Sequence, residues 1–169
     1  MFDQFAEFVD EPTRQNFMAL RRMLIKHESY RPYSNPLAPL QQAADSEDWE
    51  GLLQAVPSAM PGMLLSARLH MLASIAHEKL GHEEDAMMEK MLYQRCLEGI
   101  RLTGQGTEEQ PWLVLRVSDE YDVLFATGRT LERQSLVSSG ERKLDHLVCT
   151  DGSEVWFDVT DMLMRGIGD

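Results

Sequence analysis

The spacing of apolar residues changes character once in this chain, at the segment Thr103 to Thr107. Before it, apolar residues recur three and four positions apart, which predicts amphipathic helices. After it, short alternating runs are separated by glycine-containing turns, which predicts strands. The chain therefore divides into a helical region, residues 1–103, and a small α+β region, residues 104–169. Because 169 residues is about the size of one domain, we expect the two regions to pack together as one unit.

Proline residues divide the first part of the helical region. A first helix is predicted to begin at Asp10, with Pro12 in its first turn, and to end before Pro32. A short second helix follows. A third helix is predicted to begin at Ser46, whose side chain suits an N-cap, and to be broken at Pro57.

Two longer helices complete the helical region. The first carries an apolar stripe that closes at Gly81, and the second runs from Glu83 to about Leu102. The short link between them predicts an antiparallel hairpin. The pattern Leu72-x-x-x-Ala76-x-x-x-Leu80-Gly81-x-x-x-x-Ala86 resembles part of a tetratricopeptide repeat. That resemblance implies helical hairpins of the tetratricopeptide type.

The second region is predicted to be a small, mainly antiparallel sheet with one or two short helices. Its first strand is expected at residues 112–117, followed by a short helix that Ser118 caps and Gly128 ends. Three more strands are expected near 130–138, 142–150 and 153–159, and the last two are joined by Asp151-Gly152, a strong hairpin signal. A last short helix should start at Thr160. The fold class is α+β.

Several segments of the second region resemble an uncharacterised bacterial domain family found largely in Bacteroides-like organisms. The resemblance is carried by Thr103-Gly104-x-Gly106-Thr107-Glu108-Glu109, Val114, Ser118-x-Glu120-Tyr121-x-x-Leu124, Gln134-Ser135-Leu136, Leu144-Asp145 and Phe157-Asp158. The family has no established activity, so the resemblance implies a fold and no function.

The formal net charge of −12 is spread along the chain. Residues 1–103 hold ten basic and fifteen acidic side chains, a net of −5, and the remainder holds six and thirteen, a net of −7. Such a surface repels a phosphate backbone, so we expect no nucleic-acid partner. It is compatible either with simple solubility or with a basic protein partner.

The remaining composition predicts a cytoplasmic protein. Cys96 and Cys149 are the only cysteines, which is too few for a disulfide framework. The first residues are acidic and lack the basic segment of a signal peptide. No apolar run approaches the roughly 20 residues of a membrane span, so no membrane partner is expected.

The reactive side chains of this sequence do not have the spacing that known catalytic and metal-binding motifs require. His77 and His82 are five residues apart, about 140° around a helix, whereas a zinc-binding helix needs four. His146 and Cys149 should lie on opposite faces of a strand, as should Asp145 and His146. The sequence therefore predicts no catalytic residue, metal ligand or cofactor.

The chain contains eleven methionines, an unusual number. Methionine fills irregular gaps in a core, and it also forms adaptable binding surfaces. Both interpretations remain open for the group nearest the helical hairpin: Met63, Met71, Met87, Met88 and Met91.

Three function classes follow. The first is a non-enzymatic protein-interaction or scaffold module that uses the methionine-rich hairpin. The second is an acidic inhibitor or immunity-type protein that binds a basic effector. The third is a small-ligand binder or enzyme on the exposed sheet face, where Arg133, Asp158 and either Asp145 or His146 are expected to converge. A homodimer through a strand edge or the methionine face is also compatible with the sequence.

Overall fold

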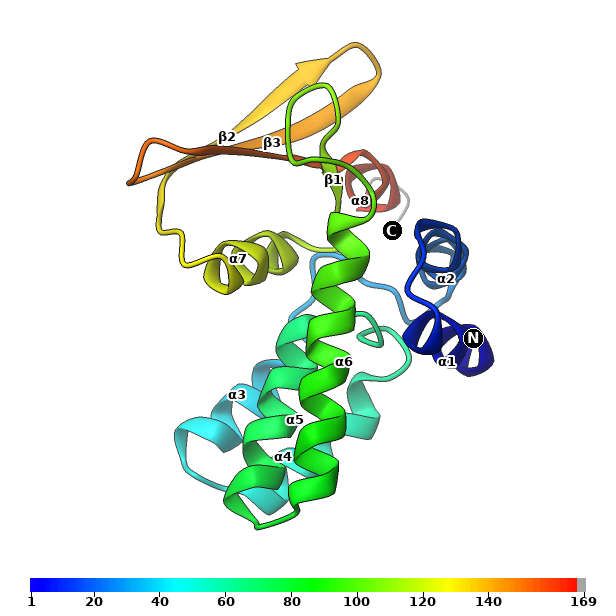
Figure 1. Ribbon diagram of the computed structural model, residues 1–169, viewed down its shortest axis with the longest axis vertical. Coiled ribbons are helices and arrows are strands. Elements are labelled where there is room, and N and C mark those ends of the chain that lie inside the picture. Colours follow the sequence, from blue (N-terminus) through cyan, green and yellow to red (C-terminus); the bar gives the residue numbers. More distant parts are fainter. Residues whose placement is uncertain (167–169) are drawn as a thin grey trace.

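The computed structural model describes residues 1–166 and has an α+β fold, as the sequence predicts (Figure 1). The helical region contains α1 (Phe2–Asp10), α2 (Arg14–Lys26), α3 (Ala38–Asp45), α4 (Trp49–Ala59), α5 (Ala67–Lys79) and α6 (Glu83–Arg101). The second region contains β1 (Trp112–Leu113), α7 (Val117–Ala126), β2 (Leu131–Ser139), β3 (Arg142–Cys149), β4 (Glu154–Asp158) and α8 (Thr160–Gly166). No described helix combines the length and apolar character that a membrane crossing requires.

Three predicted features of the first helices are wrong. The first residues form a helix of their own, α1, so the Asp10 start is incorrect, and α2 begins after Thr13, whose side chain accepts a hydrogen bond from the Asn16 amide. Asp48, not Ser46, caps α4. Pro57 lies inside α4 and does not break it. It removes the amide that would donate to the Leu53 carbonyl, but α4 ends only two residues later, at Ala59, so the rest of the helix keeps its hydrogen bonds.

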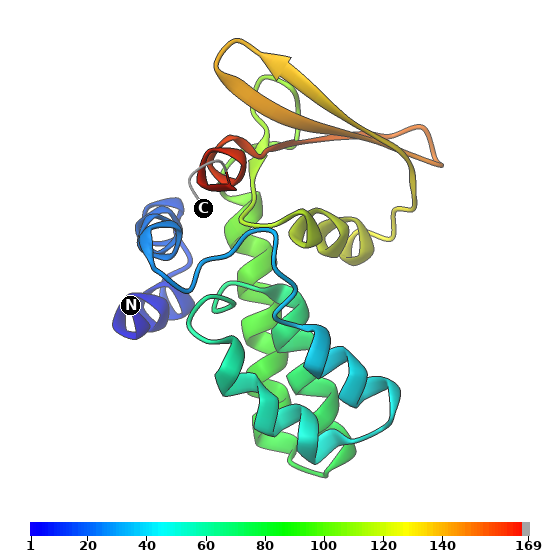
Figure 2. The ribbon, with the colours of Figure 1, turned by 180° about the vertical axis from the view of Figure 1, so that it is seen from behind.

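The α5–α6 hairpin forms as predicted, with Gly81 in the left-handed conformation between the two helices (φ 76°). α3 and α4 pack against α5, and α1 packs against α2. Figures 1 and 2 show α6 running from the lower hairpin up to the sheet, with α7 beneath the sheet.

The sheet has the strand order β1-β4-β3-β2. β2, β3 and β4 form the predicted antiparallel hairpins, with Gly140 and Gly152 at positive φ in their turns. β1 pairs parallel to β4, which the sequence did not indicate.

The predicted strand over residues 112–117 is mostly wrong. Pairing ends at Leu113, and the chain turns into α7 at Val117, so Ser118 lies inside that helix. The carboxylate of Asp119 stabilises this turn, because its Oδ2 accepts hydrogen bonds from the amides of Leu115 and Arg116, each at 3.0 Å. These bonds replace the strand pairing that this run would otherwise need.

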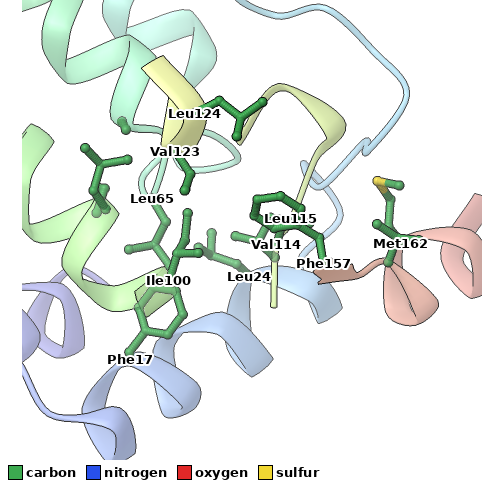
Figure 3. Packing of buried hydrophobic residues seen from close by; sticks show 14 of the residues in the cluster. Phe17, Leu24, Leu65, Ile100, Val114, Leu115, Val123, Leu124, Phe157 and Met162 are labelled. Carbon is green, nitrogen blue, oxygen red and sulfur yellow. The ribbon is translucent and has the colours of Figure 1, made fainter. Parts of the chain in front are cut away.

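One hydrophobic core joins the two regions. Figure 3 shows Phe17 and Ile100 of the helices packed with Val123 of α7, and Phe157 of β4 nearby in the same cluster. A second, smaller core lies between α3, α4 and α5. Polar contacts join the regions as well. Among them, the buried Arg21 donates to Asp161 at 2.7 Å and to the Val114 carbonyl at 3.1 Å, and the Tyr30 hydroxyl donates to the Leu115 carbonyl.

Candidate functional site

The structure divides the five methionines between core and surface. Met63 is buried in the core between α3, α4 and α5, and Met71 and Met91 are half-buried. Met87 and Met88 of α6 are 72% and 55% exposed. Met87, Met88, Met91 and Glu84 line a hollow on the outside of α6. We call these four residues the methionine face.

Acidic side chains surround the methionine face. Glu78, Glu83 and Asp85 are exposed beside Glu84 at the hairpin turn. Residues 77–91 hold five acidic and two basic side chains, a net of −3. A second hollow, between α5 and α6, adjoins the face through Met87 and includes Glu78 and Glu83. The surface therefore combines flexible apolar groups with negative charge.

Polar contacts between α5 and α6 fix the orientation of this face. The Ser74 hydroxyl donates to the Ala86 carbonyl at 3.0 Å. Both ring nitrogens of the buried His70 are hydrogen-bonded, Nδ1 to Glu89 Oε2 at 2.6 Å and Nε2 to the Leu64 carbonyl at 3.1 Å. Burial acts to lower the pKa of His70, but hydrogen bonds with Cys96 and Glu89 outweigh it and raise the pKa to about 10. With Ala86 and Glu89 held against α5, Met87 and Met88 lie on the outer side.

The four sheet candidates do not converge. Asp145 pairs with Phe157 and lies on the face that is turned toward α7, whereas His146 is on the opposite face. His146 stacks on Trp156 with ring centroids 4.0 Å apart and contacts Glu154. Arg133 and Asp158 share the His146 face but pair with Val148 and Leu144, four residues or about 13 Å apart along β3. Asp158 instead accepts a hydrogen bond from the Thr160 amide at the start of α8.

Asp145 joins a buried polar cluster that sequence reasoning missed. Glu120 of α7 has no exposed surface, and its side chain is hydrogen-bonded to that of Asp145. The Gln134 side-chain amide donates to Glu120 at 3.1 Å and to Asp145 at 3.0 Å, and its oxygen accepts from the Tyr121 hydroxyl at 2.7 Å. We call these four residues the carboxyl cluster.

Burial keeps one carboxyl group of this cluster protonated. Removal from water, reinforced by the neighbouring Asp145, raises the pKa of Glu120 to about 10. Burial also raises the pKa of Asp145, although its hydrogen bonds with Gln134 and Glu120 oppose the rise. The pair therefore holds one proton, with Glu120 as donor and Asp145 as acceptor. Glu120, Gln134 and Asp145 all belong to segments that carry the bacterial-domain resemblance, which was the one sequence signal that could have grouped them.

The structure corrects the separation predicted for His77 and His82. Their Nδ1 atoms are 3.3 Å apart, and Asp85 Oδ2 is 3.9 Å from His77 Nδ1. The angle predicted from a single continuous helix did not apply, because the chain reverses direction at Gly81, between the two histidines. The ligand atoms of His77, His82 and Asp85 lie within 4.8 Å of one another, as a metal site requires. Only three groups gather in this exposed turn, one fewer than the four that close a structural zinc site.

No family model, curated protein or solved structure matches this chain, so the arrangement of its own side chains is the basis for a functional assignment.

Proposed function

We propose that this protein is an interaction module that binds a basic, amphipathic helix of a protein partner on the methionine face. The single observation that carries the proposal is the exposure of Met87 and Met88, side by side on α6, within a net-negative turn. Methionine side chains adapt to different apolar shapes, and the surrounding carboxylates favour a partner with lysine or arginine beside its apolar residues.

The two hollows support a helical occupant. One lies on the outside of α6 and the other between α5 and α6, and Met87 borders both. A helix presents apolar side chains at positions i and i+4 on one face, so two neighbouring residues of the partner can enter the two hollows. This proposal unites the scaffold class with the class of acidic proteins that bind a basic effector.

A pair of synthetic peptides tests the proposal. One helical peptide carries leucines at i and i+4 flanked by lysines, and its matched partner carries glutamates in place of the lysines. The basic peptide should bind and should shift the ε-methyl resonances of Met87, Met88 and Met91 in an NMR titration. Because burying a methionine contributes about 1.5–3 kcal/mol, Met87→Gln with Met88→Gln should weaken binding about tenfold or more.

Met164→Gln is the matched control, since Met164 of α8 is 69% exposed on another part of the molecule. Its affinity for the basic peptide should equal that of the unmodified chain. Equal affinity for both peptides, or binding that survives the Met87 and Met88 changes, would contradict the proposal. Sedimentation of the free protein at increasing concentration tests the alternative that a second copy covers the face. If the unmodified chain forms a dimer and the Met87/Met88 variant does not, the occupant of the face is a second copy and not a different protein.

A further inference from the structure

A separate pocket lies away from the methionine face and its two hollows, where the connector between α2 and α3 passes the start of α7 (Figure 2). Its volume is about 370 Å³. The walls come from Tyr33, Pro36 and Leu37 of the connector side, from Arg68 of α5, and from Arg116 and Ser118 at the start of α7. Among the described residues that line this pocket, none is acidic, although the whole chain carries a net charge of −12.

The first turn of α7 supplies hydrogen-bond donors to this pocket. The amides at the start of a helix have no acceptors within the helix, and the helix dipole makes that end positive. Asp119 accepts the amides of Leu115 and Arg116, which precede the helix. The amides of Val117 and Ser118, both at the pocket wall, are left for a ligand. Such an arrangement favours an anion.

Arg116 is an independent indication of a ligand. Its side chain is 4% exposed, and it lines the pocket. Nη2 donates to the Gly62 carbonyl at 3.0 Å, and the guanidinium lies 5.3 Å from the centre of the Tyr30 ring. Nε is fully buried without a hydrogen-bond partner in the described part of the chain, Nη1 also forms no hydrogen bond there and is not fully buried, and the guanidinium forms no ion pair with any described residue. Asp119 attracts the guanidinium from beyond ion-pair distance, but no described acceptor contacts Nη1, and a buried cation whose donors lack acceptors is unfavourable.

Arg68, which is paired with Asp122, adds a second guanidinium to the pocket wall. Its Nε and Nη2 both donate to a single oxygen, Asp122 Oδ1, at 2.8 and 2.5 Å. This ion pair fixes the guanidinium and leaves Nη1 unused among the described contacts. Neither the Ser118 hydroxyl nor the side-chain amide of Gln41 forms a hydrogen bond with any residue in 1–166, so both are available at the pocket wall.

We infer that this pocket binds a small organic phosphate. Arg116, the Val117 and Ser118 amides and Arg68 would hold the phosphate oxygens, because guanidinium groups and helix N-termini both suit that geometry. Tyr33, Pro36 and Leu37 would contact a compact apolar body, and the volume is in the range of small-molecule sites. This inference is independent of the proposed partner surface, which lies on α5 and α6.

Phenyl phosphate is the probe, with inorganic phosphate, phenol and phenylacetate for comparison. An amide NMR titration with phenyl phosphate should give saturable shifts centred on Val117 and Ser118. Phenol should not bind, and inorganic phosphate should bind more weakly because it lacks the apolar body. Tighter binding of phenylacetate would overturn the assignment of a phosphate, and equal binding of inorganic phosphate would overturn that of an organic ligand.

Two variants test the assignment. Arg68→Gln removes the second guanidinium of the lining but also leaves the buried Asp122 without its partner, so retention of the fold is checked by circular dichroism. Ser118→Asp keeps the test independent of folding, because it places a carboxylate in the first turn of α7, where it favours the helix but repels a phosphate. Each should weaken phenyl phosphate binding about tenfold or more, since a charge-assisted hydrogen bond contributes about 1.5–3 kcal/mol. Arg133→Gln, which removes an exposed cation from β2, should leave the affinity unchanged. Binding of equal strength to Ser118→Asp, or no saturation with the unmodified chain, would refute the inference.

Discussion

At the scale of single residues, the most unusual feature is how many ionisable side chains α7 buries. Asp119, Glu120 and Asp122 are all buried and belong to one helix, and the cost of burying each carboxyl group is compensated in a different way. Asp119 accepts two amides, Asp122 pairs with Arg68, and Glu120 remains protonated beside Asp145. Buried carboxyl groups are stable only with such partners. The helix therefore depends on residues from β3 and α5 as well as on its own sequence.

The raised pKa of Glu120 makes stability depend on pH. Between its unfolded pKa of about 4.5 and its folded pKa of about 10, the folded state holds a proton that the unfolded state has lost. For this group, the free energy of unfolding therefore falls as the pH rises through that window. Glu120→Gln keeps a donor toward Asp145 and removes the proton linkage. We expect the variant to gain about 1–3 kcal/mol relative to the unmodified chain at pH 9 and much less at pH 5.

Urea unfolding at several pH values measures this difference. Glu132→Gln, an exposed change on β2, is the control and should follow the unmodified chain at every pH. Parallel stability curves for Glu120→Gln and the unmodified chain would show that Glu120 is already ionised at neutral pH.

At the scale of elements, α6 connects the two ends of the molecule. Its first half packs against α5 and carries the methionine face, and its last turns contact α2 and β1. Gly99 allows the close approach to α2, because a Cβ built there would lie 2.2 Å from Cδ2 of Phe17. The missing side chain therefore sets the distance between α6 and the N-terminal helices.

Gly99→Ala should be destabilising although alanine favours helices. The added methyl group overlaps the Phe17 ring, and overpacking of this kind costs about 1–3 kcal/mol. Gln94→Ala on the exposed side of α6 should change the free energy of unfolding by less than about 0.5 kcal/mol. Combining Gly99→Ala with Phe17→Leu should cost less than the sum of the single changes. Additive losses in chemical denaturation would mean that the two sites do not touch.

At the scale of the whole molecule, the helical and α+β regions share a core. Phe17, Leu20 and Ile100 from one region are in the same cluster as Leu147 and Phe157 from the other. Arg21 and Tyr30 add hydrogen bonds across the same boundary. Neither region can bury these side chains alone.

We therefore expect residues 1–166 to unfold in a single transition. Trp49 lies in the helical region, and Trp112 and Trp156 lie in the sheet. A variant that keeps only Trp49 and another that keeps only Trp156 should give coincident fluorescence transitions in urea, because both regions lose the shared core together. Circular dichroism of the same samples provides the control for global unfolding. Two separated midpoints would show that the regions are independent domains.

Local patterns were sufficient to predict much of the fold. Apolar periodicity identified α5, α6 and the strands β2 to β4, and Asp151-Gly152 identified their last hairpin. These features depend on interactions between residues near in sequence, namely turn conformation and the alternation of faces. The short β1 and its parallel pairing with β4 escaped prediction, because they depend on contacts of residues 112 and 113 with residues 157 and 158.

The candidate sites required the folded chain. Glu120 on a helix contacts Asp145 on a strand. Arg116 is covered by Tyr30 and Gly62, which are far from it in sequence and exclude water from its side chain. His82 reaches His77 only because the chain reverses at Gly81. Periodicity tells which face of an element a side chain occupies, but burial, pKa and the distance between two groups depend on which elements pack together.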